Sequence, residues 1–290
     1  MSSKLTQTIS SFRTGSDHFA ARSRQENFPV ASRLLPRRER EHLMAIYGFA
    51  RLTDDIGDEA EGDRLALLDW LDDELNLAFH GEAIHPVFQR LTPMIESLDL
   101  SPVPFRALIE ANRVDQRVTH YDTFEDLVGY CMLSAAPVGH LVLAVFHAAT
   151  PERVELSDKI CIALQVLEHL QDVGEDARAG RIYLPREDMK HFDCRSEELL
   201  APSASPALRR LVAYEAERAG TLLLDGSPLA ATLPWRPRLA IDGFVGGGLA
   251  VIDALGAASY DVLAIHCRPT KRALGTHVLH ALIPQMRSTA

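Results

Sequence analysis

Polar side chains recur on one face of an apolar segment in the first quarter of the chain. The segment LMAIYGFARLTDDIGDEA carries, at intervals of three and four residues, Tyr47, Arg51, Asp54, Asp55 and Asp58. This spacing places the side chains on one face of a helix. Asp54 and Asp58 are one turn apart, so their Cβ atoms would lie about 6 Å from each other. Because two carboxylates at that spacing repel each other and can share metal ions, the pattern indicates a cation site.

A second segment, KICIALQVLEHLQDVGEDARAGRIYLP, repeats the pattern in a more apolar setting. Its polar line, at steps of three, four and four residues, consists of Gln165, Glu168, Asp172 and Asp176. A helix that is apolar on nearly all other sides is buried, so this line should face an internal cavity. Carboxylates there need counter-charge. Mg²⁺ suits the role because it takes a few carboxylates and completes its shell with water and phosphate oxygens.

Each acidic pair has an alternative explanation. A single pair is better explained as a solvated helix face or a cap, by about three to one, but two pairs on apolar helices reverse that preference. A ferritin-like di-iron site is disfavoured because it needs a Glu-x-x-His motif on each of two helices. Glu39 and His42 fit that motif once, with no clear mate. A surface helix turn explains them better.

Helices must position both polar lines, because apolar residues recur every three or four positions almost throughout and alternating β-branched runs are nearly absent. We therefore expect an all-α fold. The expected helices cover residues 37–59, 64–79, 84–97, 102–117, 123–149, 155–178, 205–225 and 236–257, with a short pair near the C-terminus. Asp122 and Glu125 predict a capping box, and Pro137 with Gly139 predicts a kink in the helix that follows.

Composition limits the classes of partner. The net charge of −10, from 30 Lys and Arg against 40 Asp and Glu, argues against a broad nucleic-acid surface. The charge is uneven, because residues 1–51 hold nine basic and four acidic residues whereas residues 52–82 hold one and eleven. No linker-like tract divides the chain, which predicts a single domain over residues 1–290 whose first 20 residues need not be ordered.

The cysteines and the apolar stretches indicate a compartment. The four cysteines are more than twenty residues apart and form no CxxC pair, which disfavours zinc and redox motifs and predicts buried thiols in a reducing cytosol. No stretch looks long enough to span a bilayer, and the first residues lack the apolar core of a secretory signal. We expect a cytoplasmic protein, with peripheral contact at the inner face of the membrane as a further possibility.

At its acidic segments the chain resembles the squalene and phytoene synthase family, which joins or processes prenyl diphosphates head to head. The family pattern of an Arg three residues before a DDxxD-like element is met by Arg51, Asp54, Asp55 and Asp58. The second motif is met by DVGED at 172–176, followed by RIYLP at 181–185. The two motifs together are specific. The resemblance implies the isoprenoid synthase fold, in which helices surround a central apolar cavity.

The resemblance also implies roles for individual residues. Mg²⁺ would be bound by Asp54, Asp58, Asp172 and Asp176. The prenyl diphosphate would be contacted by Asn27, Phe28, Tyr47, Arg51, Gln165, Glu168 and Arg181. Catalysis would involve Arg51, Tyr130 and Tyr183. Arginine suits a leaving diphosphate because its fork pairs two phosphate oxygens. Two alternatives stay open: Arg51 can pair with Asp55 one turn on, and Arg181 can neutralise the end of its own helix.

Within the family, ENFPVAS at 26–32 and AIYGFARLTDDIGDE are most like the bacterial branch that makes hydroxysqualene. This implies that presqualene diphosphate is ionised and water captures the cation, in squalene and hopanoid biosynthesis. Four features depart from the family: Glu168 replaces a frequent Asn, Gln171 a frequent basic residue, and Gly248 a late tyrosine. The fourth is QENF at 25–28, in place of a Ser-rich, basic N-terminal loop that binds diphosphate. They disfavour condensation of two farnesyl diphosphates. A condensing squalene, presqualene diphosphate or phytoene synthase and a non-catalytic scaffold stay as alternatives.

A carbocation needs a dry apolar pocket with aromatic faces. The candidate rings are Phe28, Tyr47, Phe49, Phe124, Tyr130 and Phe146. Most aromatic residues on apolar helix faces belong to the core, so only a minority should line the pocket. The candidates for holding the attacking water are Tyr130, Tyr183 and Glu168.

Overall fold

A computed structural model describes residues 35–270 of the 290-residue chain. Several predictions lie outside these residues: the order of residues 1–20, the roles of Asn27 and Phe28, and the short pair of helices near the C-terminus. Within residues 35–270 the regular structure is helical, and the strand-like pairing is an isolated bridge between His120 and Ile182. The predicted all-α fold is confirmed.

The described chain divides into two compact units. Unit 1 comprises the residues up to Arg117 together with Ala136–Val154, and unit 2 comprises Val118–Ala135 and the residues from Glu155 onward. Each unit carries one of the two acidic segments. The single domain over residues 1–290 stays a prediction.

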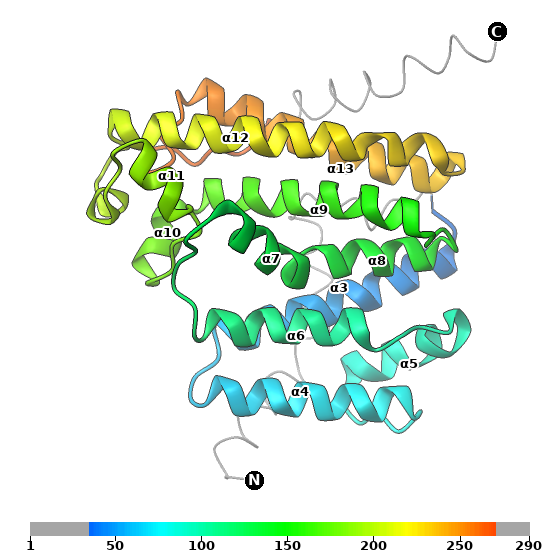
Figure 1. The fold of residues 1–290 in the computed structure, drawn as a ribbon. Coiled ribbons are helices and arrows are strands. Elements are labelled where there is room, and N and C mark those ends of the chain that lie inside the picture. Colours follow the sequence, from blue (N-terminus) through cyan, green and yellow to red (C-terminus); the bar gives the residue numbers. More distant parts are fainter. Residues whose placement is uncertain (1–34, 271–290) are drawn as a thin grey trace, which may run out of the picture. The chain divides into compact units, whose positions relative to one another are not determined.

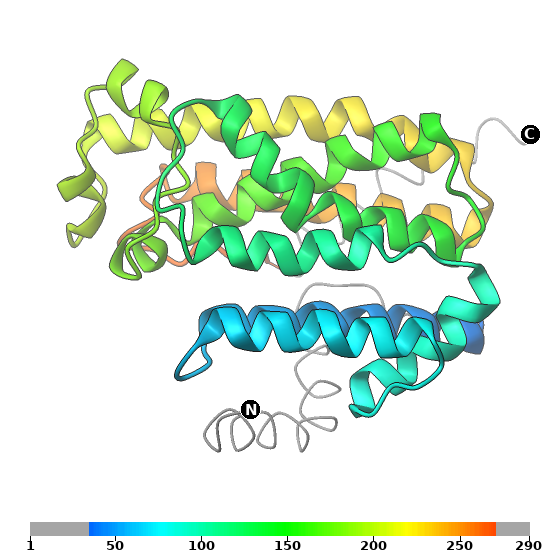
Figure 2. The same ribbon diagram turned by 60° about the horizontal axis from the view of Figure 1, so that its bottom comes forward.

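Unit 1 is built around an aromatic core that fixes the first acidic segment. Its helices are α3 (Arg37–Asp58), α4 (Arg64–Phe79), α5 (Pro86–Leu98), α6 (Val103–Asp115) and α8 (Ala136–Val145). Phe49 of α3 meets Phe88 and Phe105 edge to face, with ring centroids 5.7 Å and 5.2 Å apart, and all three rings are fully buried. Phe49 is therefore a core residue. Figure 2 shows α3 and α4 running side by side. Because Phe49 is buried in the core, its burial determines which face of α3 lies away from the core.

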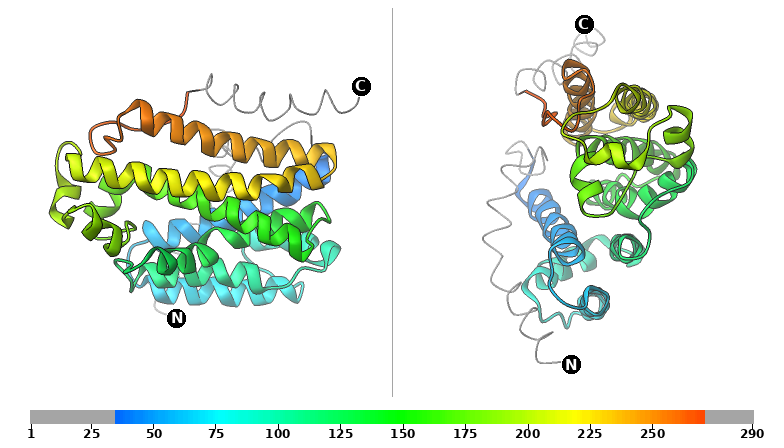
Figure 3. Two further views of the ribbon diagram at one scale, coloured as in Figure 1. Left: turned by 45° about the horizontal axis from the view of Figure 1, so that its top comes forward. Right: turned by 90° about the vertical axis from the view of Figure 1, so that its left-hand side faces the viewer.

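Unit 2 holds the second acidic segment. Its elements are α7 (Phe124–Ser134), most of α9 (Pro151–Gln171), α10 (Val173–Arg178), α11 (Arg186–His191), η2 (Ser196–Leu200), α12 (Pro206–Gly226), η3 (Ser227–Thr232) and α13 (Trp235–Ala257). The helices α12 and α13 lie side by side and are joined by η3 (Figures 1 and 3). Glycines bring them close to α9. A Cβ at Gly226 would lie 2.6 Å from the carbonyl oxygen of Leu156, and one at Gly248 would lie 3.0 Å from the side chain of Leu164.

The long predicted helices agree with the observed ones, but three details differ. The capping box of α7 pairs Thr123 with Asp126, one residue later than predicted, with the backbone N–H of each bonded to the side chain of the other. The helix predicted over 155–178 is interrupted at Asp172. Periodicity does not reveal this break, because the helical register continues through it. The predicted kink near Pro137 is a break at Ala135 between α7 and α8.

Apolar stretches are longer than expected from the sequence. The segments Phe124–Val145 and Trp235–Ala257 are long and apolar enough to cross a membrane by length and composition, so the expectation that no stretch reaches that length was wrong. The first segment is divided at Ala135, and 56% of its apolar window is buried, against 39% for the second. Core helices pass the same test.

The four cysteines are free thiols, and the prediction that they are buried is confirmed for three of them. Cys131, Cys194 and Cys267 are buried and Cys161 is half-buried. Burial raises the pKa of the Cys131 thiol to about 12. Such a thiol is unreactive at neutral pH.

Candidate active site

The first acidic face lies on the C-terminal half of α3 in unit 1. Asp54 and Asp58 are exposed, whereas Asp55 is half-buried. The Nε of Arg51 lies 2.8 Å from Oδ1 of Asp55, and its guanidinium also lies 3.6 Å from Glu59. The ion pair between Arg51 and Asp55 that was left open as an alternative is therefore present. Asp54 and Asp58 are the carboxylates that this face presents to solvent.

Helix α6 supports this turn through a contact that the sequence did not indicate. The amide nitrogen of Asn112 lies 3.4 Å from Oδ1 of Asp54, and Gln116 donates to the carbonyl oxygen of Gly57 at 3.0 Å. A Cβ at Gly57 would lie 1.9 Å from Oδ1 of Asn112. Only glycine fits there, and its absent side chain is what lets Asn112 reach the acidic turn.

The second polar line runs along the end of α9 into α10 in unit 2. Asp172 is the residue between the two helices, with φ −104° and ψ 12°. Its N–H still donates to the carbonyl oxygen of Glu168, and its own carbonyl oxygen accepts from the N–H of Asp176 at 2.8 Å. The one-turn spacing of Asp172 and Asp176 therefore survives the break. Burial, and then the neighbouring carboxylates of Glu168 and Asp176, raise the pKa of Asp172 to about 6.

An aromatic cluster packs beside this line. Three tyrosines of unit 2 contact one another, with ring centroids 5.5 Å apart for Tyr130 and Tyr183, 5.5 Å for Tyr121 and Tyr130, and 5.9 Å for Tyr121 and Tyr183. All three are buried. The fourth ring is His169, which stacks on Tyr183 with centroids 3.7 Å apart and planes 13° apart. Of these four rings, the sequence predicted only Tyr130 and Tyr183 as functional.

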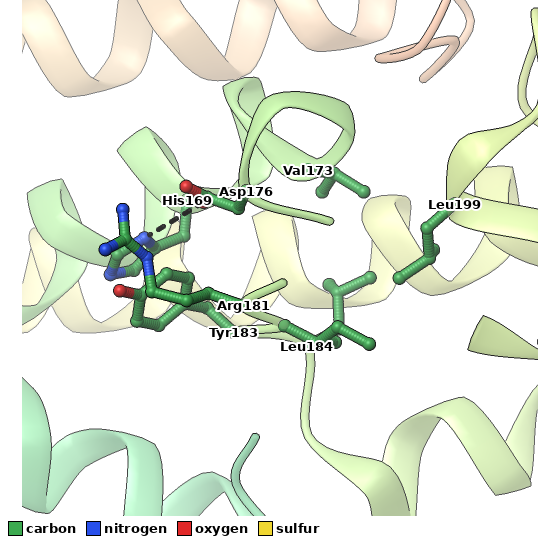
Figure 4. A pocket seen from close by; sticks show the side chains of 8 residues that line it. His169, Val173, Asp176, Arg181, Tyr183, Leu184 and Leu199 are labelled. Atoms are coloured by element: carbon green, nitrogen blue, oxygen red, sulfur yellow. Dashed lines mark ion pairs between the residues drawn. The ribbon is translucent and has the colours of Figure 1, made fainter. Parts of the chain in front are cut away.

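His169 connects the aromatic cluster to the acidic line. Its Nδ1 lies 3.6 Å from Oδ2 of Asp176, and its Nε2 lies 3.2 Å from Nε2 of Gln165. Figure 4 shows this contact between His169 and Asp176 beside Arg181 and the ring of Tyr183. His169 lies four residues after Gln165, and this one-turn spacing was a sequence signal for the contact between the two side chains.

A small pocket opens at the same place. His169, Asp176 and Arg181 form its polar side and Leu184 and Leu199 part of its apolar side (Figure 4). Its cavity volume of about 10 Å³ is the space of a single water molecule. The pocket by itself therefore does not accommodate a prenyl chain.

The loop after α10 brings Arg181 to this pocket. Gly180 has φ +83°, a conformation that glycine adopts without strain, and it reverses the chain after α10. Arg181 then donates its N–H to the carbonyl oxygen of Asp176, and Ile182 donates to that of Thr119. These bonds tie the loop both to the acidic line and to the segment that carries Tyr121.

Comparisons with known proteins agree with these motifs. The family model described as squalene/phytoene synthase matches residues 21–274. The chain is 36% identical over 230 residues to a hydroxysqualene synthase of Rhodopseudomonas palustris, covering 78% of this chain and 76% of that protein. It is 33% identical over 209 residues to a phytoene synthase of Arthrospira platensis, covering 67% and 68%. The crystal structure of squalene synthase HpnC from Alicyclobacillus acidocaldarius matches with a TM-score of 0.78 and 40% identity, covering 93% and 98%.

The chain belongs to the squalene/phytoene synthase family. It is an enzyme with the fold of squalene synthase-type isoprenoid synthases, as the resemblance implied. The family acts on prenyl diphosphates and generally depends on a divalent metal.

The carboxylates of the two acidic motifs are ligands that suit the divalent metal of this family. Within residues 35–270, no group of three or more His, Cys, Asp and Glu side chains is arranged to hold a metal ion. Mg²⁺ does not need such a cage, because one or two carboxylates with water and substrate phosphates satisfy it. Burial raises the pKa of Asp172, and the neighbouring carboxylates of Glu168 and Asp176 raise it further. A cation there would relieve this repulsion.

The predicted site residues of the family fall into two sets. Unit 1 carries Tyr47, Arg51, Asp54 and Asp58, and unit 2 carries Tyr130, Gln165, Glu168, Asp172, Asp176, Arg181 and Tyr183. At Gly248, where the family was expected to have a tyrosine, a Cβ would lie 2.6 Å from the side chain of Leu223. A side chain at that position would therefore require Leu223 to shift.

Proposed function

We propose that this enzyme ionises presqualene diphosphate in a Mg²⁺-dependent reaction and captures the cation with water, giving hydroxysqualene and diphosphate. The observation that carries the proposal is the 36% identity to a hydroxysqualene synthase over 78% of the chain, together with both aspartate motifs. The crowded carboxylates of the second motif support a role in metal binding.

The aspartates and arginines would act on the leaving group. Asp54 and Asp58 from unit 1, and Asp172 and Asp176 from unit 2, would hold Mg²⁺, which neutralises charge that develops on the diphosphate. Arg181, at the pocket beside Asp176, would pair with phosphate oxygens. Arg51 already pairs with Asp55 and would add positive charge at the first motif. Tyr47, Gln165, Asn27 and Phe28 would contact the diphosphate or the start of the prenyl chain.

The tyrosine cluster would serve the cation. The carbon–oxygen bond to diphosphate breaks and the electron pair leaves with the diphosphate. The π faces of Tyr130 and Tyr183, both buried, would stabilise the remaining positive charge. The oxygen of water forms the new bond to carbon, and its proton passes to the departing diphosphate. Tyr130, Tyr183 and Glu168 are the candidates to hold that water.

Two substrates and labelled water test the proposal. The purified enzyme with Mg²⁺ should release diphosphate from presqualene diphosphate and not from farnesyl diphosphate, and EDTA should stop the release. In ¹⁸O-labelled water the product alcohol should carry one heavy oxygen. Release from farnesyl diphosphate alone would replace the proposal with a condensing synthase.

Condensation of two prenyl diphosphates is the second candidate function. It is favoured by the 33% identity to a phytoene synthase over 67% of the chain. Squalene, presqualene diphosphate or phytoene as the product would identify it. A non-catalytic scaffold would release diphosphate from neither substrate while folded.

The proposed setting is the bacterial cytoplasm, in squalene and hopanoid biosynthesis. Substrate and product are lipids, so we place the enzyme in peripheral contact with the inner face of the membrane. Co-sedimentation with lipid vesicles tests this contact, and full recovery in the supernatant would contradict it.

A further inference from the structure

The face and both nitrogens of the His169 ring contact other side chains. Its side chain is 11% exposed, its face stacks on Tyr183, and its two nitrogens point to different partners. Each nitrogen thus has a polar group beside it, as buried polar atoms require. One of these groups, Asp176, belongs to the second acidic motif, so the ring joins that motif to the tyrosine cluster.

The two polar contacts of His169 can be assigned donors and acceptors. The Nε2 of Gln165 is an amide nitrogen, which donates and never accepts. In this orientation of the Gln165 amide, the imidazole Nε2, at 3.2 Å, accepts the hydrogen bond. The ring proton then belongs on Nδ1, which faces the carboxylate of Asp176 at 3.6 Å. The chain of contacts runs from Gln165 through His169 to Asp176.

From these contacts we infer that His169 is a positioning residue: it orients the carboxylate of Asp176 for the divalent metal and holds the ring of Tyr183 flat beside it. The inference rests on the proposed function only in taking Asp176 as a metal ligand. Groups that hold a metal-binding carboxylate or imidazole from behind set its orientation, and losing one typically lowers metal affinity by about 10- to 100-fold.

The stack links this orientation to the reaction. Tyr183 contacts Tyr130 and Tyr121, so the ring of His169 supports one end of the tyrosine cluster. The same imidazole would thus position Asp176, which acts on the leaving diphosphate through the metal, and Tyr183, whose ring faces the cation. The adjacent residue, Glu168, is exposed on another side of the helix. Its carboxylate therefore cannot take the place of the His169 imidazole between Tyr183 and Asp176.

Two substitutions separate the nitrogens from the ring. His169→Phe keeps a flat ring for Tyr183 and removes both nitrogens. His169→Gln removes the ring and keeps an amide donor that can reach Asp176. His191→Phe on α11 is the matched control, because His191 is exposed and contacts Phe192 rather than the acidic line.

The experiment is binding of Mn²⁺ in the presence of inorganic diphosphate, followed by electron paramagnetic resonance, with thermal melting of each variant as a measure of folding. We expect Mn²⁺ affinity to fall about 10-fold in His169→Phe and to recover in part in His169→Gln. The control should bind as the unaltered enzyme does. Diphosphate release from whichever prenyl diphosphate the enzyme accepts should need correspondingly more Mg²⁺ in His169→Phe.

Other results for the Mn²⁺ affinities of the variants would overturn the inference. If His169→Phe binds Mn²⁺ as tightly as the unaltered enzyme, the imidazole only packs against Tyr183. If His169→Phe does not fold, His169→Leu takes its place, and equal Mn²⁺ affinity in His169→Leu and His169→Gln would overturn the inference. Failure of the unaltered enzyme to bind Mn²⁺ would overturn the metal role of Asp176 itself, whereas binding without hydroxysqualene formation would overturn only the proposed function.

Discussion

The substitution Asp172→Asn should stabilise the metal-free enzyme while it removes activity. Asp172 has a pKa of about 6 because it is half-buried and faces the carboxylates of Glu168 and Asp176. Its ionised form is therefore unfavourable in the folded protein. An Asn of the same size removes the charge and keeps the shape, so it relieves the repulsion. An active-site residue that lowers stability is the expected signature of a binding site built for a cation.

The size and sign of the effect follow from the pKa. Well below pH 4 the carboxyl is neutral in both the folded and the unfolded chain, so Asp172 imposes no penalty there, and at pH 4 the penalty is a small part of its full size. As the pH rises from about 4 to about 6, the unfolded chain loses its proton first and the free energy of unfolding falls. The shift of about two units corresponds to about 3 kcal/mol. Because the side chain is only half-buried, solvent screening reduces this to about 1–2 kcal/mol.

Urea denaturation with EDTA at pH 4 and at pH 8 measures the effect. Asp172→Asn should match the unaltered enzyme at pH 4 and exceed it by about 1–2 kcal/mol at pH 8. Turnover with Mg²⁺ should fall by about 100- to 1,000-fold, as it does when one preorganised electrostatic group is lost. Asp73→Asn, at an exposed position of α4, is the control and should change neither quantity. A variant less stable than the unaltered enzyme at pH 8 would refute the reasoning, and undiminished turnover would refute the metal role.

Three further predictions concern other parts of unit 2. Burial, and then a hydrogen bond with Asp188, raise the pKa of Glu215 to about 8, so thermal stability should fall as the pH rises from about 5 to 8; Glu215→Gln should flatten that slope in a calorimetric pH series, and an unchanged slope would assign it to other groups. Gly248→Ala should lower the free energy of unfolding in urea by about 1–3 kcal/mol, because the added Cβ would lie 2.6 Å from Leu223; a stabilised variant would contradict the close packing. The thiol of Cys131, with a pKa of about 12, should not react with a disulfide reagent at pH 8 until the protein is unfolded; rapid reaction of the native enzyme would show that the thiol is accessible.

Local patterns were enough to predict the elements that carry the site. The apolar periodicity placed α3 within one residue at each end and predicted the helical character of α9, although α9 begins four residues earlier and ends at Gln171. A long amphipathic or apolar segment has few other ways to satisfy its backbone in a buried setting. The same periodicity placed Asp54 and Asp58 one turn apart, and Asp172 and Asp176 likewise. These are properties of neighbours along the chain. The interruption at Asp172 escaped prediction because the hydrogen bonds on either side keep the register of a continuous helix.

The sequence by itself determined that this protein is helical and that its acids lie in two one-turn pairs, because both depend on spacing within a few turns. The motifs that carry these acids also revealed the resemblance to its family. Only the tertiary structure decided that Asn112 reaches the first acidic turn across the bare backbone of Gly57, and that His169 lies between Tyr183 and Asp176. Asn112 lies on a different helix from Asp54, and Tyr183 lies on a loop after α10, and no periodicity predicts contacts between separate elements. Such contacts are set by how side chains fill the space between elements.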